Sequence, residues 1–376
     1  MKMRLHMILG VALAAFATAS AAEELVRIGL AAPLTGPQAH LGQDIANGAR
    51  LAIEEINATQ PKLGGQPVRF ELVVEDDQAD PRTATVVAQK FVDSGVKGVI
   101  GHLNSGASIP ASRVYNDGRV PQISPCSTAV AYTHQGFDTT FRLMANDAQQ
   151  GAALGEYAAK IGKRVAVVDD RTAYGQGLAD EVVKALKARG VEPIAHEFTT
   201  DKSTDFTAIL TSIKGKKPDV IVYCGMDAQG APMARQMRTL GIKALFLGGD
   251  GIQTAEFIKL AGTATENAVG SSPGLPLEKM PGGADFEKRF AAKYGKIQLY
   301  APFAYDSVRV MVDAMRRAGS ADPEKYRAEL AKTDTKGVVG HIAFDAMGDL
   351  KDGAVTLYQV KEGKWSAVET LGGSSR

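Results

Sequence analysis

The chain has 376 residues, of which 45% are hydrophobic and 23% charged, a balance typical of a soluble globular protein rather than a disordered one. A formal charge of +1 and the lack of any basic block argue against nucleic acid as a partner. Only Cys126 and Cys224 are present, which excludes a small disulfide-stapled domain; we expect two buried free thiols, with a single bridge as the alternative.

The N-terminus has the pattern of a secretory signal peptide over residues 1–22. Lys2 and Arg4 supply the positive charge, residues 8–17 form an apolar stretch too short to span a bilayer, and small residues precede Glu23. An uncleaved anchor is the alternative. Cleavage leaves 376 − 22 = 354 residues, enough for roughly two domains of about 150 residues. We therefore predict an exported protein.

Short apolar strands and amphipathic helices alternate along most of the mature chain. Strands are predicted at 26–30, 68–75, 99–100, 121–124, 165–168, 220–223 and 245–247. Helices are predicted at 44–57, 82–94, 108–116, 147–161, 175–189, 206–214 and 231–240. The four consecutive apolar residues at 165–168 are typical of a strand covered on both faces. The alternation predicts an α/β fold with parallel sheets in two Rossmann-like lobes.

The C-terminal part departs from this alternation. Three successive helices are predicted at 285–294, 302–318 and 324–332 as additions to an existing sheet. Edge strands are predicted at 340–344 and 355–360, and disorder at 372–376.

Enzyme motifs are largely missing, and no cofactor is predicted. The six His residues show no metal-ligand spacing, and no nucleophile elbow, P-loop or dinucleotide fingerprint occurs. The acidic pairs at 76–77 and 169–170 follow strands, where solvated carboxylates are a simpler explanation than a cation site. His102 lies three residues before Ser105, but this spacing alone has no specificity for a base and a nucleophile.

Four segments at the predicted carboxyl ends of strands carry residues suited to a zwitterion. These segments are 101–106, 124–128, 174–175 and 248–251. A hydroxyl beside free N–H groups at a helix N-terminus suits a carboxylate, and an acid between glycines, here Asp250, suits an ammonium group. Together they predict a receptor for a small zwitterion.

At these residues the chain resembles the leucine/isoleucine/valine-binding proteins, which are type I periplasmic binding proteins of ABC importers. The matching segments are 33–36, 48–57, 75–77, 80–81, 99–103, 110–112, 174–179 and 348–350. The resemblance implies a Venus-flytrap receptor with lobe 1 at 24–143 plus 270–349, lobe 2 at 144–269 plus 350–376, and a three-crossing hinge. It also implies a monomer that delivers an amino acid to an ABC permease in the inner membrane.

The resemblance further implies a set of ligand-binding residues. Ser105 and Thr128 would bind the carboxylate, while Thr128, the Cys126 carbonyl and Asp250 would bind the ammonium group; Tyr174 would contribute an aromatic ring from lobe 2. The remaining candidates surround the side chain of the ligand: Leu41, Leu103, Met226 and Tyr300. Helix capping for the two hydroxyls, a turn role for Asp250 and core packing for Tyr174 are the alternatives.

Departures from close relatives bear on the ligand. Where close relatives have an aromatic residue, Tyr, Glu and Phe, this chain has Leu41, Met226, Asp250 and Tyr300, respectively. Ala79 and Asn104 replace two Cys that form a family disulfide. Branched-chain amino acids are the leading ligands; another α- or γ-amino acid, an aromatic acid or a small amide is the alternative. An exported hydrolase and a stand-alone sensor domain are less favoured functions.

Overall fold

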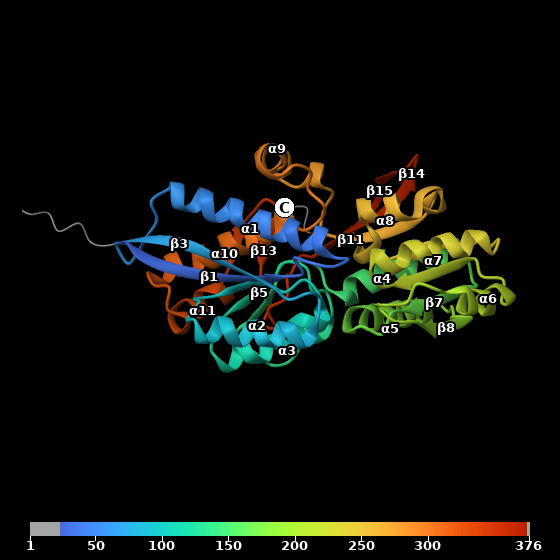
Figure 1. Cartoon of the computed structure of the whole chain (residues 1–376), viewed down its shortest axis with the longest axis horizontal. Helices are drawn as coiled ribbons and strands as arrows, with labels where there is room; N and C mark the ends of the chain where they lie inside the picture. Colours follow the sequence, from blue (N-terminus) through green and yellow to red (C-terminus); the bar gives the residue numbers. More distant parts are fainter. Residues whose placement is uncertain (1–22, 374–376) are drawn as a thin grey trace, which may run out of the picture.

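The computed structural model describes residues 23–373, so the predicted signal peptide lies outside the described residues. Two α/β units lie end to end in an elongated molecule (Figure 1). We define lobe 1 as the elements on the first sheet, 24–142 and 277–350, and lobe 2 as those on the second sheet, 147–273 and 354–372. The predicted two-lobed α/β fold is thus confirmed.

Lobe 1 is built on a six-stranded sheet with the order β2-β3-β1-β4-β5-β6. Its strands are β1 (Glu24–Ala32), β2 (Lys62–Leu63), β3 (Gln66–Asp76), β4 (Val99–Gly101), β5 (Gln122–Ser124) and β6 (Thr140–Arg142). All neighbours are parallel except β2 and β3. The helices are α1 (Ala39–Ala58), α2 (Pro81–Asp93), α3 (Ser105–Asp117), α9 (Gly283–Tyr294), α10 (Ala301–Ala318) and α11 (Pro323–Ala331).

Both faces of this sheet are covered, because successive residues of a strand point to opposite sides. Val26, Ile28 and Leu30 of β1 lie in one apolar cluster with α1 and α10. Ala31 of β1 lies in a separate cluster with α2 and α3. Figure 1 shows α1 above the sheet and α2 and α3 below it. Short elements complete the lobe: η1 (Val130–Tyr132), η4 (Leu277–Lys279), and the paired strands β12 (Asp334–Lys336) and β13 (His341–Ala343).

Lobe 2 has a seven-stranded sheet with the order β15-β14-β11-β10-β9-β7-β8. Its strands are β7 (Val165–Asp169), β8 (Ala195–Phe198), β9 (Val220–Cys224), β10 (Leu245–Gly248), β11 (Val269–Pro273), β14 (Ala354–Lys361) and β15 (Lys364–Gly372). Its helices are α4 (Asp147–Ile161), α5 (Ala173–Ala188), α6 (Thr207–Gly215), α7 (Asp227–Thr239) and α8 (Ala255–Ala261), with the turns η2 (Asp250–Ile252) and η3 (Gly262–Thr265). β7 is fully buried: Val165 and Val167 pack with α4 and α5, and Ala166 and Val168 pack with α6 and α7.

The chain passes between the lobes three times, after β6, after β11 and after β13. Arg142 and Asp349 tie the first and third passages together, with Arg142 Nε donating to Asp349 Oδ1 at 2.9 Å. Asn146 Nδ2 donates to the other carboxylate oxygen of Asp349 at 2.9 Å. The predicted boundary after residue 269 falls inside β11, whose five residues all belong to the second sheet.

The C-terminal predictions need correction. The strand predicted at 355–360 is β14, but it is not an edge strand, because β15 pairs along its outer side. The strand predicted at 340–344 is β13, which pairs with β12 instead of extending either large sheet. Gly372 ends β15, and 374–376 lie outside the described residues.

Other expectations can be checked in the described part of the chain. Cys126 and Cys224 are free and buried, as expected. Across residues 23–373, none of the helices is both long and apolar enough to cross a bilayer. The same residues contain no group of three His, Cys, Asp or Glu side chains arranged to hold a metal ion.

Candidate ligand site between the lobes

Eight of the nine predicted site residues line one small cavity between the lobes. Lobe 1 contributes Leu103, Ser105, Cys126, Thr128 and Tyr300, and lobe 2 contributes Tyr174, Met226 and Asp250, with Asn104 as a further lining residue. The cavity volume is about 20 Å³, which is room for about one water molecule. Leu41 is not among the lining residues: it is fully buried on α1, in the same apolar cluster as Met226 and Tyr300, and its contact with a ligand stays a prediction.

The fold brings these residues together because the carboxyl ends of both parallel sheets face the same gap. β4 leads to Ser105, and β5 leads to Thr128. In lobe 2, β7 leads to Tyr174, β9 to Met226 and β10 to Asp250. Each predicted segment therefore reaches the cavity from the end of its own strand.

The two lobe 1 hydroxyl residues sit at helix N-termini. Ser105 is the first residue of α3, and its Oγ accepts the backbone N–H of Ala129 at 3.2 Å. The Thr128 carbonyl accepts the N–H of Asp147, the first residue of α4, at 2.8 Å. Ser105 does not cap its own helix, which was the alternative role. The N-terminus of α3 thus lies beside Ser105, where it suits a bound carboxylate, whereas the first N–H groups of α4 already donate to the Thr128 carbonyl and the Asn146 side chain.

His102 holds the loop that precedes Ser105. Its Nδ1 lies 2.7 Å from Asp77 Oδ2, and its Nε2 lies 3.0 Å from the Tyr115 hydroxyl. Its carbonyl accepts the Ser124 hydroxyl at 2.9 Å. Because both ring nitrogens have these partners, His102 is not placed to act as a base toward Ser105.

Asp250 is buried and accepts three hydrogen bonds from uncharged groups. Its Oδ1 accepts the Tyr174 hydroxyl at 2.8 Å and Gln150 Nε2 at 3.0 Å, and its Oδ2 accepts the Tyr300 hydroxyl at 2.6 Å. Burial raises the pKa of the Asp250 carboxyl, and these hydrogen bonds offset only part of that effect. Within residues 23–373, Asp250 forms no salt bridge with Lys, Arg or His. A buried carboxylate with neutral partners is suited to a cationic group of a ligand.

The glycines around Asp250 have packing reasons. A Cβ on Gly249 would lie 2.3 Å from the Tyr174 hydroxyl oxygen, and a Cβ on Gly251 would lie 2.4 Å from the Gly225 carbonyl oxygen. Both distances are shorter than any tolerated contact, so only glycine lets Tyr174 reach the carboxylate. The turn η2 is therefore shaped to present Asp250, which goes beyond the simple turn role considered from the sequence.

Tyr300 reaches Asp250 from the other lobe. Asp44 of α1 accepts the backbone N–H groups of residues 298 to 301 at 2.7–3.0 Å, which fixes the start of α10 and the position of Tyr300. Burial raises the pKa values of the Tyr174 and Tyr300 hydroxyls well above 10, so both remain hydrogen-bond donors. The Tyr300–Asp250 hydrogen bond thus joins lobe 1 to lobe 2.

Two polar residues behind Asp250, Gln150 and Asp147, were not predicted from the sequence. Gln150 Oε1 accepts the Asp250 N–H at 3.0 Å and the Ser271 hydroxyl at 2.6 Å. Asp147 lies beside this glutamine, and burial together with the charge of Asp250 raises its pKa to about 8. Gln150 and Asp250 are 100 residues apart, so no local motif connects them. This network orients Asp250, and because the Asp147 carboxyl is mostly protonated at pH 7 it adds no second negative charge beside Asp250.

A second cross-lobe contact lies outside the cavity. His40 Nε2 of α1 is 3.0 Å from Asp227 Oδ2, at the first residue of α7, and the same oxygen accepts the Thr254 hydroxyl at 2.6 Å. Burial disfavours protonation of His40, but Asp227, with a smaller contribution from Glu256, outweighs it and raises the pKa of the imidazole. This contact exists only while the lobes lie together.

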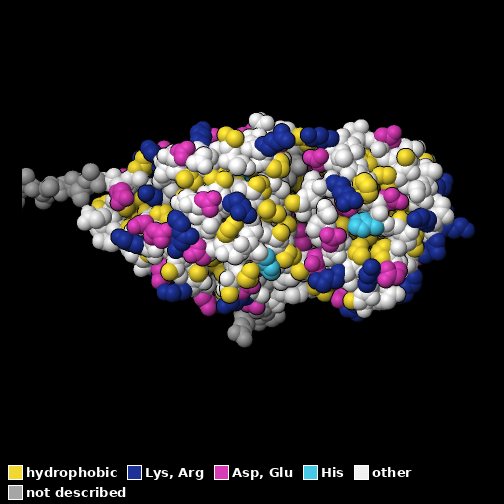
Figure 2. Space-filling view, turned by 90° about the horizontal axis from the view of Figure 1, so that it is seen from below, with side chains coloured by type: hydrophobic (Ala, Val, Ile, Leu, Met, Phe, Trp, Pro, Cys, Tyr) yellow, Lys and Arg dark blue, Asp and Glu magenta, His cyan; other side chains and the backbone are white. Residues whose placement is uncertain are grey.

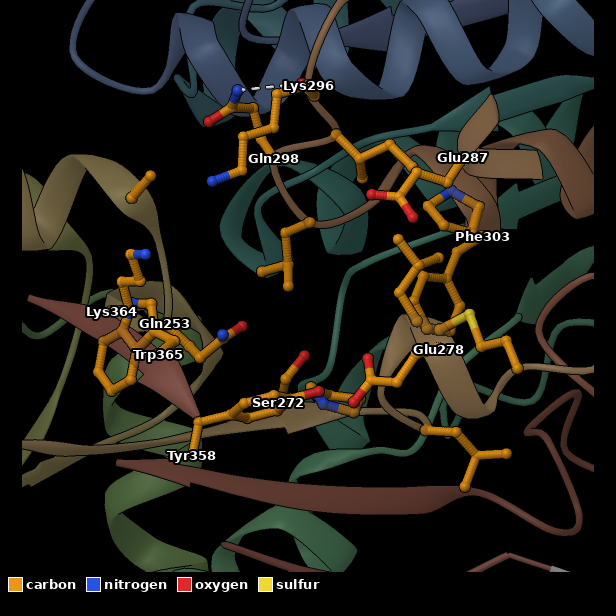
Figure 3. Close-up of a pocket in the computed structure, with 18 of the residues that line it drawn as sticks. Gln253, Ser272, Glu278, Glu287, Lys296, Gln298, Phe303, Tyr358, Lys364 and Trp365 are labelled. Atoms are coloured by element: carbon orange, nitrogen blue, oxygen red, sulfur yellow. Dashed lines mark hydrogen bonds between the residues drawn. The ribbon is translucent and has the colours of Figure 1, made fainter. Parts of the chain in front are cut away.

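The structure contains two larger spaces, of which one adjoins the small cavity. An outer chamber of about 620 Å³ lies between the lobes and shares Asn104, Tyr174 and Met226 with the inner cavity. Seen from below, the lobes meet along a narrow line beside which acidic side chains gather (Figure 2). The other space, of about 450 Å³, contains none of the predicted site residues; Gln253 and Phe303 lie on opposite sides of it (Figure 3).

Comparison with known proteins shows which family has this architecture. Residues 25–364 match the family described as periplasmic binding protein. The chain belongs to the periplasmic binding protein family. Among curated members, the Leu/Ile/Val-binding protein homolog 1 of Brucella melitensis is 36% identical, over 96% of this chain and 97% of the relative. A leucine-, isoleucine-, valine-, threonine-, and alanine-binding protein of Pseudomonas aeruginosa is 34% identical over 93% of each chain.

Solved structures of periplasmic binding proteins have the same two-lobed fold. A leucine-binding protein from Thermotoga maritima superposes with a TM-score of 0.85 at 29% identity, covering 92% of this chain and 98% of its own. A branched-chain amino acid transporter substrate-binding protein from Streptococcus pneumoniae, in complex with isoleucine, gives a TM-score of 0.84 at 29% identity and covers 93% and 100%. The relatives of this chain are thus substrate-binding proteins of amino-acid ABC transporters.

Proposed function

We propose that this protein is the periplasmic substrate-binding component of an amino-acid ABC importer, and that leucine, isoleucine and valine are its leading ligands. The observation that carries the proposal is the buried Asp250 carboxylate, which has three uncharged donors and shares the cavity with Ser105 at the N-terminus of α3 in the other lobe. Charge of opposite sign at the two ends suits a zwitterion. Family membership and the names of the relatives support the same ligand class.

In this proposal, Ser105 and Thr128 bind the ligand carboxylate, with the N-terminus of α3 behind Ser105. Asp250 binds the ammonium group, assisted by the Cys126 carbonyl, and Tyr174 covers the ligand from lobe 2. Leu103, Met226 and Tyr300 surround the first part of the side chain; each buried methylene there contributes about 0.8 kcal/mol. Capture and lobe closure involve no covalent step.

The cellular setting is part of the proposal. The predicted signal peptide would export the chain to the periplasm, where it acts as a monomer and delivers ligand to a permease complex in the inner membrane. Another α- or γ-amino acid, an aromatic acid or a small amide is the alternative ligand, because each could use part of the same charged site. The lack of a base at Ser105 argues against a hydrolase.

A thermal-shift screen of the mature protein against amino acids, small amides and aromatic acids tests the proposal. A ligand at a thousandfold excess over its Kd should stabilise the folded state by about 4 kcal/mol. Mass spectrometry should recover the ligand unchanged and in stoichiometric amount. The proposal fails if no amino acid raises the unfolding temperature, or if the recovered compound has been converted.

A further inference from the structure

Asn104 has a side chain that its own helix does not use. It is the N-cap residue of α3, yet its side chain makes no capping hydrogen bond. Asn146 at the start of α4, by contrast, accepts two backbone N–H groups. The Asn104 Nδ2 group donates to Gln38 Oε1 at 2.7 Å, and its Oδ1 is buried with no hydrogen-bond partner in the described part of the chain. Capping of α3 therefore does not explain why an amide side chain lies at this position.

The position of Asn104 suggests a use for it. Together with Tyr174 and Met226, it lines both the inner cavity and the outer chamber. The inner cavity, at about 20 Å³, has room for about one water molecule, so a ligand side chain must extend beyond it. A ligand side chain that leaves this cavity toward open space passes the Asn104 amide and enters a chamber of about 620 Å³.

The outer chamber has both polar and apolar lining residues. Its lining includes six uncharged polar side chains besides Asn104: Thr35, Gln38, Gln78, Thr172, Thr200 and Gln229. Three acidic residues and two basic ones also line it, so neither charge dominates: Asp80, Asp170, Asp201, Arg171 and Lys202. Met226 is its one long aliphatic side chain. Further apolar surface comes from Pro37, Ala79, Pro81, Ala173 and Tyr174. An uncharged polar ligand side chain therefore finds hydrogen-bond partners here as well as apolar surface.

We propose that Asn104 forms a polar side-chain subsite, so that this receptor also binds amino acids whose side chains carry a hydroxyl or a carboxamide. The ligand O–H or N–H donates to Asn104 Oδ1, while Gln38 holds the amide in place. The inference rests on the proposed amino-acid receptor function and defines the range of ligands at the same site. Asn104 acts as a specificity residue because it satisfies polar side chains that an apolar wall would leave without partners.

Isosteric ligand pairs test the inference. Threonine and valine have the same shape, as do asparagine and leucine, so within each pair the ligands differ mainly in polarity. Titration calorimetry would measure Kd for all four with the wild-type protein and with Asn104→Leu. In the wild type, each polar ligand should bind within about tenfold of its aliphatic isostere. In Asn104→Leu, the threonine-to-valine and asparagine-to-leucine Kd ratios should each rise about tenfold or more, while valine and leucine bind at least as tightly as before.

Two further variants make the result interpretable. Gln229→Leu changes the outer chamber alone and should leave the threonine-to-valine ratio within about twofold of wild type. Asn104→Ala should raise both ratios as Asn104→Leu does, and it provides the test if the leucine variant fails to fold. Unchanged ratios in the Asn104 variants overturn the inference, as does a wild type that binds valine and leucine but neither polar ligand. A wild type that binds none of the four overturns the proposed function as well.

Discussion

Replacing Asp250 by Asn separates the charge of this residue from its shape. The amide keeps an acceptor and the size of the side chain, but it gives a ligand ammonium group no opposite charge in a buried site. Removing one partner of a buried ion pair costs about 3–5 kcal/mol. The affinity for leucine should therefore fall by roughly 150- to 5,000-fold.

The stability of the empty protein should respond differently. The folded-state pKa of Asp250 is raised by burial, so the ionised side chain destabilises the fold once the pH rises above its ordinary unfolded-state value. An amide carries no such cost, and Asp250→Asn should unfold at the wild-type temperature or above it at pH 7. Asp250→Ala instead leaves three donors unpaired, at about 1–3 kcal/mol each. It should unfold at least about 5 °C lower.

The assay pairs calorimetric titration of leucine at pH 7 with thermal unfolding of the ligand-free wild type and both variants. The expected pattern is loss of binding in both variants but loss of stability in Asp250→Ala alone. Leucine binding by Asp250→Asn within tenfold of wild type would show that the ammonium group binds elsewhere. A comparable loss of stability in both variants would show that Asp250 serves the fold and is not a charge reserved for a ligand.

Three further outcomes follow from the contacts described above. The His40–Asp227 ion pair is present below the raised pKa of His40 and lost as the pH rises through it, so the affinity for leucine should fall several-fold between about pH 6 and pH 9. His40→Gln should flatten that titration profile, and a profile identical to wild type would refute the link. Tyr300→Phe removes one hydrogen bond to the buried carboxylate and should weaken leucine binding about 10- to 150-fold; an unchanged Kd in titration calorimetry would contradict this. Burial raises the pKa of the Cys126 and Cys224 thiols, so a thiol reagent should label neither in the native protein and both after unfolding; rapid native labelling at pH 7 would refute their burial.

The positions that sequence reasoning located correctly share a physical cause. Ser105, Thr128 and Asp250 each follow a short apolar strand, and parallel sheets bring all such strand ends to one edge. Local pattern is enough to place a residue there. The alternation of helices and strands was equally readable, because β7 and its neighbours are buried on both faces and so consist of continuous apolar runs.

The features that the sequence did not reveal depend on packing between distant segments. Leu41 lies on a helix whose orientation is set by its contact with α10, so its burial could not be derived from its neighbours in the sequence. Gln150 acquires its role from Asp250, in another part of the lobe. No strand is predicted at β11, because its sequence Val-Gly-Ser-Ser-Pro lacks an apolar run, although all five residues are buried in the sheet. β15 is mostly exposed and lacks an apolar run, so its sequence does not predict a strand.

The cross-lobe contacts explain why closure can depend on ligand. The Tyr300–Asp250 and His40–Asp227 hydrogen bonds favour the closed form even without a ligand. The same closure buries the ionised Asp250 without a counter-charge, which opposes it. A ligand ammonium group removes this opposing term, and a ligand shifts a conformational equilibrium only by its differential affinity for the two forms. The buried aspartate thus makes the empty closed form costly and the occupied closed form favourable, so one charge serves both for recognition and for coupling recognition to closure.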